Sequence, residues 1–239
     1  MSPLTEPALI LWDIDHTLLT TGGVSHEVYA RAFRTVVGTP MAALADMAGR
    51  TERAIVLDTL ALNHVADPED KLDAFYAALG EVARDMKDQM RAHGRRLPGA
   101  AEAIAGLANA DLIQSVVTGN LPAIAAVKLE AFDLLDGLDT SVGGYGDDGS
   151  DRADLVRLAL QRAATAYGRP FAAKRTVIVG DTPHDIRGAH DAGAVAIGVA
   201  TGRSSVEDLA AVGAEVVFAD LSDTAAVRTA VFQSLLGGI

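Results

Sequence analysis

Cysteine is absent from this chain of 239 residues. Its absence excludes disulfide bonds, thiolate metal sites and a cysteine nucleophile, and it agrees with a reducing, cytoplasmic compartment. Long apolar runs are also missing, because no stretch approaches the roughly 20 residues that a membrane helix needs. The first segment, MSPLTEPALILWDID, has no basic flank and reaches Asp13 after a short apolar run. We therefore expect neither a signal peptide nor a membrane partner.

Basic residues are few. Lys and Arg number 20 against 32 Asp and Glu, which gives a formal net charge of −12. Such a charge repels the phosphate backbone of nucleic acids, so we expect no nucleic-acid partner. Hydrophobic residues make up 49% of the chain and charged residues 22%, a composition typical of a folded protein with a sizeable core. The composition leaves open whether the acidity is only solvated surface or performs chemistry.

Five short apolar runs are typical of buried strands, and helical patterns lie between most of them. This alternation predicts the α/β class, with a Rossmann-like, doubly wound parallel sheet whose strands end at one shared edge. The expected strands are Ala8–Trp12, Leu112–Val117, Thr176–Val179, Val195–Val199 and Ala214–Phe218. The expected helices of this core are Pro98–Ala108, Pro122–Phe132, Asp151–Ala166, His184–Asp191 and Ser205–Ala211.

Residues 20–97 interrupt this alternation, because they contain no convincing strand. We expect a core made of residues 1–19 and 98–239, and a helical cap, residues 20–97, inserted between the first two core strands. Glycines lie at both joins, close to the candidate site, so we favour a mobile cap over a static helical subdomain. The helices expected in the cap are Val24–Val37, Pro40–Asp46, Glu52–Asn63 and Pro68–Ala92.

Polar residues follow three of the expected strands. The first group is Asp13-Ile14-Asp15-His16-Thr17. Side chains at positions i and i+2 of an extended chain point to the same side, so Asp13 and Asp15 should lie close together. Two carboxylates at close range are costly unless a cation or a shared proton compensates. The alternative is an ordinary turn in which Asp15 or Thr17 caps a helix.

The second group, Thr118-Gly119-Asn120, precedes a helix with Pro122 in its first turn. A hydroxyl and free backbone N–H groups at a helix N-terminus can bind an anion. The alternative is a simple N-cap by Thr118 or Asn120.

The third group adds two carboxylates, Asp181 at a strand exit and Asp185 in the first turn of the next helix. A cluster of oxygen ligands without sulfur suits a hard cation, above all Mg2+. Three polar strand ends on one sheet edge are improbable by chance. We therefore predict a metal site formed by Asp13, Asp15, Asp181 and Asp185.

In these motifs the sequence resembles the haloacid dehalogenase superfamily over essentially its whole length. The signature Asp-x-Asp-x-Thr corresponds to Asp13, Asp15 and Thr17, the threonine that ends the second strand to Thr118, and Gly-Asp-x-x-x-Asp to residues 180–185. The helical insertion is similar to the type 1 cap of the phosphoglycolate phosphatase-like branch. The resemblance implies a phosphatase of small phosphate monoesters, such as phosphoglycolate-like compounds or sugar phosphates.

The resemblance also implies a role for each motif residue. Asp13 would attack phosphorus and form an aspartyl-phosphate, and Asp15, with a raised pKa, would serve as general acid and then base. Mg2+ would be held by Asp13, the backbone carbonyl of Asp15 and Asp181, with Asp185 nearby or bound through water. The predicted catalytic residues are Asp13, Asp15, Thr118 and Lys128, and the predicted substrate-binding residues are Thr17, Gly119, Asn120, Arg50 and His16.

The sequence departs from the family pattern at two places. His16 stands where relatives usually carry Gly; since His tolerates positive φ, we favour a conformational explanation over contact with the leaving group. The third signature is a basic residue, yet residues 143–154 contain no Lys. We choose Lys128 for this role over Arg152, the alternative for Lys128 being a solvent-facing helix lysine.

Specificity is expected to depend on the cap. Arg50 could reach an anionic substrate tail, unless its loop is only a helix start capped by Thr51, and Arg203 is a weaker candidate. The presence of Asp15 favours hydrolysis of phosphate esters over dehalogenation. A phosphomutase and a non-catalytic phospho-ligand-binding relative remain alternatives. The expected partner is a small phosphorylated metabolite, and the chain is expected to be a monomer or a homodimer.

Overall fold

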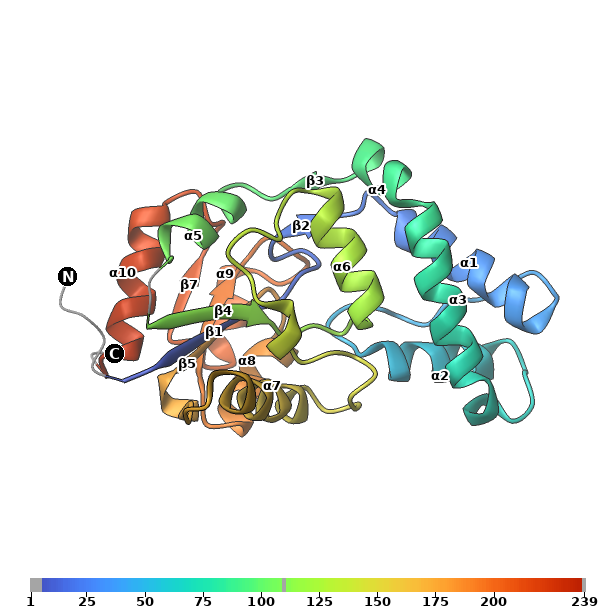
Figure 1. Ribbon diagram of the computed structural model, residues 1–239. Coiled ribbons are helices and arrows are strands. Elements are labelled where there is room, and N and C mark those ends of the chain that lie inside the picture. Colours follow the sequence, from blue (N-terminus) through green and yellow to red (C-terminus); the bar gives the residue numbers. More distant parts are fainter. Residues whose placement is uncertain (1–5, 109–110, 238–239) are drawn as a thin grey trace.

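The structure is a computed structural model that describes residues 6–108 and 111–237. A five-stranded parallel sheet lies at its centre, in the order β4-β1-β5-β6-β7 (Figure 1). The predicted parallel sheet is thus confirmed, and four of the five expected strands agree with the structure within one residue. The strands are β1 (Ala8–Trp12), β4 (Leu112–Val116), β5 (Thr176–Gly180), β6 (Val195–Val199) and β7 (Val216–Phe218).

The order of the strands reverses at β1. This strand pairs with β4 on one side and with β5 on the other, so that Leu9 lies between Ile113 and Thr176. The chain passes from β1 to β4 on one side and returns to β5 on the opposite side. Open α/β sheets bind ligands at the carboxyl end of such a reversal. The polar strand ends predicted from the sequence therefore meet at the place where a ligand site is expected.

Both faces of the sheet are covered by helices. Leu9 and Leu11 of β1 belong to one hydrophobic core, and Ile10 and Trp12 belong to another, because successive strand residues point to opposite faces. All five residues of β1 are buried, which explains their continuous apolar character. The flanking helices are α5 (Ala100–Gly106), α6 (Pro122–Ala131), α7 (Arg152–Tyr167), α8 (Pro183–Asp191), α9 (Val206–Ala211) and α10 (Thr224–Leu235), joined by the 3-10 turns η2 (Thr140–Val142) and η3 (Ala173–Arg175).

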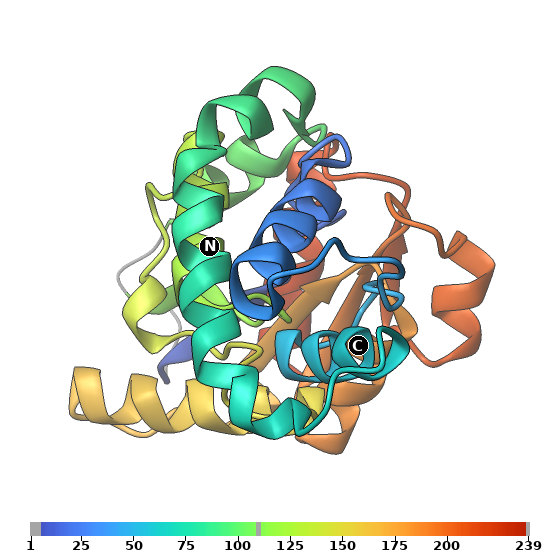
Figure 2. The ribbon, with the colours of Figure 1, turned by 90° about the vertical axis from the view of Figure 1, so that its right-hand side faces the viewer.

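A helical insertion follows β1 and lies beyond the carboxyl end of the sheet, on the side of the molecule opposite α10 (Figure 1). Its helices α1 and α3 lie side by side (Figure 2), and Tyr29 and Phe33 of α1 contact Phe75 of α3 with ring centroids 6.0 and 6.3 Å apart. The insertion comprises α1 (Val24–Val37), α2 (Glu52–Leu62), η1 (Pro68–Lys71), α3 (Leu72–Asp85) and α4 (Lys87–His93).

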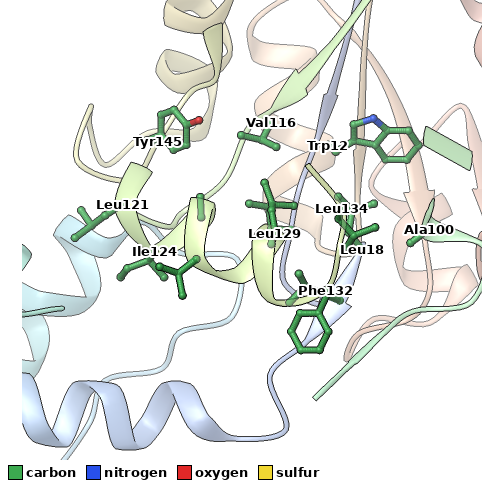
Figure 3. Packing of buried hydrophobic residues seen from close by; sticks show 14 of the residues in the cluster. Trp12, Leu18, Ala100, Val116, Leu121, Ile124, Leu129, Phe132, Leu134 and Tyr145 are labelled. Atoms are coloured by element: carbon green, nitrogen blue, oxygen red, sulfur yellow. The ribbon is translucent and has the colours of Figure 1, made fainter. Parts of the chain in front are cut away.

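Helix α6 packs between the insertion and the sheet. It packs against α3 and α4 on one side, and its buried residues join the hydrophobic cluster beside the sheet on the other. Figure 3 shows Trp12, Leu18, Leu129 and Phe132 in this cluster. Trp12 is fully buried, as predicted, and its indole Nε1 donates a hydrogen bond to Gln114 Oε1 at 3.1 Å. The insertion and the sheet therefore share one continuous core.

The two joins of the insertion pair with each other, a feature that the sequence did not reveal. A Cβ at Gly22 would lie 2.2 Å from the carbonyl oxygen of His93, so glycine is required by the close approach of the two chains. The resulting antiparallel ribbon consists of β2 (Leu19–Thr20) and β3 (Arg95–Arg96).

The helix predicted over Pro40–Asp46 is wrong, because this segment forms neither a helix nor a strand. Side chains of α2 and of its C-cap residue accept hydrogen bonds from backbone N–H groups of this segment. Asn63 Oδ1 accepts the N–H of Ala42 at 2.7 Å, and Thr59 Oγ1 accepts that of Ala45 at 3.2 Å. These bonds from a segment distant in sequence replace the bonds that a helix would make with itself.

The single helix predicted over Pro68–Ala92 is wrong as well. The chain leaves helical geometry at Met86, with φ −99° and ψ 8°, and the buried side chain of this residue anchors the junction between α3 and α4. Helix α10 was not predicted. Within residues 6–108 and 111–237, no helix has the length and apolar character to cross a membrane.

Candidate active site

Three strand ends converge at the sheet edge, as the sequence predicted. Asp13 follows β1, Thr118 comes shortly after β4, and Asp181 follows β5; their side chains are all buried. The hydroxyl of Thr17 lies 3.3 Å from Asp13 Oδ2 and 3.5 Å from Asp181 Oδ1. Thr17 thus joins two strand ends, and neither Thr17 nor Asp15 caps a helix, since the turn leads directly into β2.

Asp13, Asp181 and Asp185 form a compact group of carboxylates. Each offers an oxygen atom, and these oxygens all lie within 4.8 Å of one another. Arg152 Nη2 lies 3.5 Å from Asp13 Oδ1 and 2.9 Å from Asp185 Oδ1, yet Asp185 Oδ1 accepts no well-aligned hydrogen bond. Three carboxylates beside one guanidinium leave a net negative charge of two. This donor set fits a divalent, oxygen-preferring cation such as Mg2+.

Helix α8 holds Asp185 in place through its capping box. Asp185 Oδ2 accepts hydrogen bonds from the backbone N–H of Thr182 at 3.1 Å and from its hydroxyl at 2.7 Å, and Thr182 caps the helix in return. A Cβ at Gly180 would lie 2.4 Å from Asp185 Cβ, so only glycine fits between β5 and this side chain. The capping box leaves Oδ1 of Asp185 directed toward Arg152.

Arg152 does not fully compensate the negative charge of these three carboxylates. Burial, reinforced by Asp185, raises the pKa of Asp13 well above its ordinary value. Burial and Asp185 also raise the pKa of Asp181 to about 8. Ionised carboxylates at this position therefore cost free energy unless a further cation is bound, as expected for a metal site.

Lys128 of α6 forms an ion pair with Asp15. Its Nζ lies 2.8 and 2.6 Å from the two carboxylate oxygens of Asp15 and 2.7 Å from Asn120 Oδ1, so all three N–H donors are used. Asn120 Nδ2 donates to Asp15 Oδ2 at 2.8 Å and to Thr118 Oγ1 at 2.7 Å. Lys128 is only 3% exposed, so the alternative of a solvent-facing lysine is wrong.

This arrangement changes the acidity of Asp15. Burial alone would raise the pKa of Asp15, but the Lys128 ammonium and the hydrogen bonds from Lys128 and Asn120 together hold it below its ordinary value. Our expectation of a raised pKa for Asp15 is therefore wrong. The two cations weighed for the third signature are both present, Lys128 on Asp15 and Arg152 on Asp13 and Asp185.

The polar side chains of the loop after β4 face the site and do not cap the helix that follows. Leu121 is the N-cap residue of α6 and makes no side-chain cap bond, so Thr118 and Asn120 do not cap that helix. A Cβ at Gly119 would lie 1.9 Å from the carbonyl oxygen of Arg50, which shows how closely the insertion approaches this loop. His16 has φ 62°, in agreement with the conformational explanation for a histidine at this position.

A cavity of about 730 Å3 lies between the insertion and the sheet edge. Asp13, Asp15, Thr118 and Lys128 line it from the core, together with Gly119, Asn120, His16 and Arg152. The insertion contributes a mixture of hydroxyl, histidine, charged and aliphatic side chains, among them Ser25, His26, Leu44, Met47, Arg50 and Ile55. All the predicted catalytic and substrate-binding residues except Thr17 therefore line one cavity.

The two arginines proposed for substrate tails are engaged elsewhere. Arg50 Nη2 lies 2.6 Å from Asp58 Oδ2. Thr51 is the N-cap residue of α2, as the alternative explanation for this loop proposed. Arg203 Nη1 lies 3.2 Å from Asp46 Oδ1, and this ion pair joins the core to the insertion.

Glu52 and Tyr29 are part of the site region that the sequence did not predict. Glu52 is 4% exposed, lines the cavity and accepts a hydrogen bond from the Tyr29 hydroxyl, and its backbone N–H donates to Gly119 O at 2.7 Å. Burial raises the pKa of Glu52 to about 7. In the sequence Glu52 resembles any glutamate of a first helical turn, and no local signal marks it as buried.

This chain is similar to several known proteins. A family model described as haloacid dehalogenase-like hydrolase matches residues 10–190. A phosphoglycolate phosphatase from Agrobacterium fabrum (strain C58) is 25% identical over 233 residues, covering 95% of this chain and 94% of that protein. A hydrolase from Pseudomonas syringae has a TM-score of 0.63 at 20% identity, over 92% of this chain and 97% of its own. The crystal structure of a predicted phosphoglycolate phosphatase from Haemophilus somnus 129Pt has a TM-score of 0.65 at 20% identity, over 94% of this chain and 99% of its own.

Proposed function

The chain belongs to the haloacid dehalogenase-like hydrolases, and we propose that it is a Mg2+-dependent phosphatase of small phosphate monoesters. The observation that carries the proposal is the buried group of Asp13, Asp181 and Asp185 beside Arg152, at the reversal point of the sheet and facing a cavity of about 730 Å3. The similarity to the Agrobacterium phosphoglycolate phosphatase supports the same reaction class.

In the first step a carboxylate oxygen of Asp13 attacks phosphorus, and the bond from phosphorus to the leaving oxygen breaks. Asp15 donates a proton to that oxygen, which leaves as an alcohol. The hydroxyl of Thr118 and the N–H of Gly119 bind phosphoryl oxygens, and Arg152 orients Asp13. When bound by Asp13, Asp181, Asp185 and the backbone carbonyl of Asp15, Mg2+ supplies positive charge against the phosphoryl oxygens.

In the second step Asp15 takes a proton from water. The water oxygen attacks the phosphorus of the aspartyl-phosphate, and inorganic phosphate and free Asp13 are formed. Lys128 favours this step because it holds the pKa of Asp15 low and so keeps Asp15 ionised. In the first step a substrate phosphate close to Asp15 opposes Lys128, raises the pKa of Asp15 and favours its protonated form.

We assign residues 20–97 to a cap that excludes water from the bound substrate. Thr17, Asn120 and His16 would position the reacting groups from the core side, and Arg50 belongs to the cap wall. A phosphomutase would use the same chemistry with a cap that shields the aspartyl-phosphate from water until the product rebinds.

Turnover of p-nitrophenyl phosphate with Mg2+ tests the proposal. We expect release of nitrophenol and phosphate, loss of turnover on chelation of the metal, and loss in Asp13→Asn. Asp73→Asn, the same change at an exposed position of α3, serves as the matched control and should retain activity. Undiminished turnover by Asp13→Asn would refute the nucleophile, and phosphate transfer within a substrate without release of free phosphate would identify a mutase. Binding of phosphate without any turnover would identify a non-catalytic relative.

A further inference from the structure

The cavity extends well beyond the reacting groups. At about 730 Å3 it falls in the roughly 300–1,000 Å3 range of small-molecule sites. A two-carbon acid phosphate would fill only a small part of it. The cavity therefore has room for a larger leaving group in contact with the wall formed by the insertion, and the chemistry of that wall limits what such a leaving group can be.

The leaving group would lie beside Asp15, which protonates it under the proposed function. At this side of the cavity the insertion places Glu52, a second carboxylate, within the electrostatic reach of Asp15 and Lys128. Lys128 has no donor left, because its three N–H groups already serve Asp15 and Asn120. Asp15 is protonated when the substrate is bound, so a carboxylate carried by the leaving group would meet the negative charge of Glu52 and no free ammonium hydrogen of Lys128.

The remaining cations of the wall are also paired. Among the described residues that line the cavity, the Lys and Arg side chains are Arg50, Lys128, Arg152 and Arg203. Each lies within 3.5 Å of at least one carboxylate oxygen: Asp58 for Arg50, Asp15 for Lys128, Asp13 and Asp185 for Arg152, and Asp46 for Arg203.

A leaving group with neutral hydroxyl groups has more hydrogen-bonding partners in this cavity than one with a carboxylate. Thr20, Thr21, Ser25 and Ser204 line the cavity together with His26, and these side chains can donate and accept hydrogen bonds. No Phe, Tyr or Trp ring lines it in the part of the chain that the structure describes, so an aromatic base would find no ring to stack on.

We infer that the substrate is the phosphate ester of a neutral polyol, such as a sugar or sugar alcohol, and that Glu52 is a specificity residue that excludes leaving groups bearing a carboxylate. The inference rests on the proposed phosphatase function and narrows it. It sets this chain apart from a phosphoglycolate phosphatase, whose substrate carries a carboxylate close to the leaving oxygen.

Matched substrate pairs test the inference on the unmodified protein. Glycerol 3-phosphate differs from 3-phosphoglycerate, and sorbitol 6-phosphate from 6-phosphogluconate, by a hydroxymethyl group in place of a carboxylate. At about pH 8, where an ordinary imidazole is neutral, we expect kcat/KM to favour the neutral member of each pair by about tenfold or more. Equal or reversed preference, with normal turnover of p-nitrophenyl phosphate, would overturn the inference. Failure to hydrolyse p-nitrophenyl phosphate would instead refute the phosphatase function itself.

Two variants locate the cause. Glu52→Gln keeps an acceptor for Tyr29 and removes the charge, so it should shift the kcat/KM ratio toward the carboxylate member by about threefold or more. Asp58→Asn removes the ion-pair partner of Arg50 at a position that does not line the cavity. It should shift the ratio in the same direction, with p-nitrophenyl phosphate turnover unchanged. Glu207→Gln, an exposed change on α9, is the control and should leave the ratio as it is. Unchanged ratios in both of the first two variants would overturn selection by wall charge.

Discussion

Replacement of Glu52 by Gln should stabilise the folded protein above neutral pH. The side chain is 4% exposed and accepts a hydrogen bond from the Tyr29 hydroxyl. Gln retains an acceptor oxygen in nearly the same shape, so the main change is the loss of an ionisable group. Burial raises the pKa of Glu52 from 4.5 to about 7 in the folded protein. The folded state therefore binds this proton more tightly than the unfolded chain does.

The sign and the size follow from proton linkage. The stability contributed by protonated Glu52 is fully present below the unfolded pKa of 4.5, and it is lost as pH rises through the folded value of about 7. The interval of about 2.5 pH units, at about 1.4 kcal/mol per unit, corresponds to roughly 3 kcal/mol. Other buried carboxyls, such as Asp13, contribute the same trend to both proteins and cancel in their difference.

Urea unfolding of the wild type and Glu52→Gln at several pH values provides the assay. The free energy of unfolding of the wild type minus that of the variant should fall by about 2 to 3 kcal/mol between about pH 5 and about pH 8. Glu207→Gln makes the same chemical change on the exposed surface of α9 and measures the effect of removing a surface charge. A difference between wild type and Glu52→Gln that does not vary with pH would refute the raised pKa of Glu52.

Two further predictions concern the cap and the metal group. Gly119→Ala would place a Cβ 1.9 Å from Arg50 O, so it should displace the insertion and lower kcat/KM for p-nitrophenyl phosphate about tenfold or more. Gly149→Ala, whose Cβ meets nothing within 4 Å, is the control and should leave kcat/KM unchanged. Equal activities of the two variants would contradict the close contact between the insertion and the loop after β4. Arg152→Met should destabilise the metal-free protein by about 3 kcal/mol, because the buried carboxylates lose their cation, and Mg2+ should then raise Tm by more than it does in the wild type. An equal rise in Tm would contradict this account of the charge balance.

Much of the fold follows from local patterns in the sequence. The run Ala8–Trp12 is apolar at every position because both faces of β1 are covered, and it ends at Asp13 where the strand reaches the site. Alternation of such runs with helical patterns identified the parallel sheet, and the polar residues after three strands identified the sheet edge that holds Asp13, Thr118 and Asp181.

Local patterns failed where distant partners compete for the same groups. Pro40–Asp46 has a plausible helical pattern, but Asn63 and Thr59 take its backbone N–H groups. The third signature was sought as one basic residue, whereas folding places Lys128 and Arg152 on different carboxylates.

The sequence by itself determined the sheet, the helical insertion and the carboxylates that meet at the edge, because hydrophobic periodicity and strand ends are local properties. Only the tertiary structure decided the ionic state of the site. Lys128 lowers the pKa of Asp15, and burial raises that of Glu52, because each effect depends on desolvation and on charges brought together from distant parts of the chain. The residue types were visible in the sequence, but the distances that set their chemistry arise only on folding.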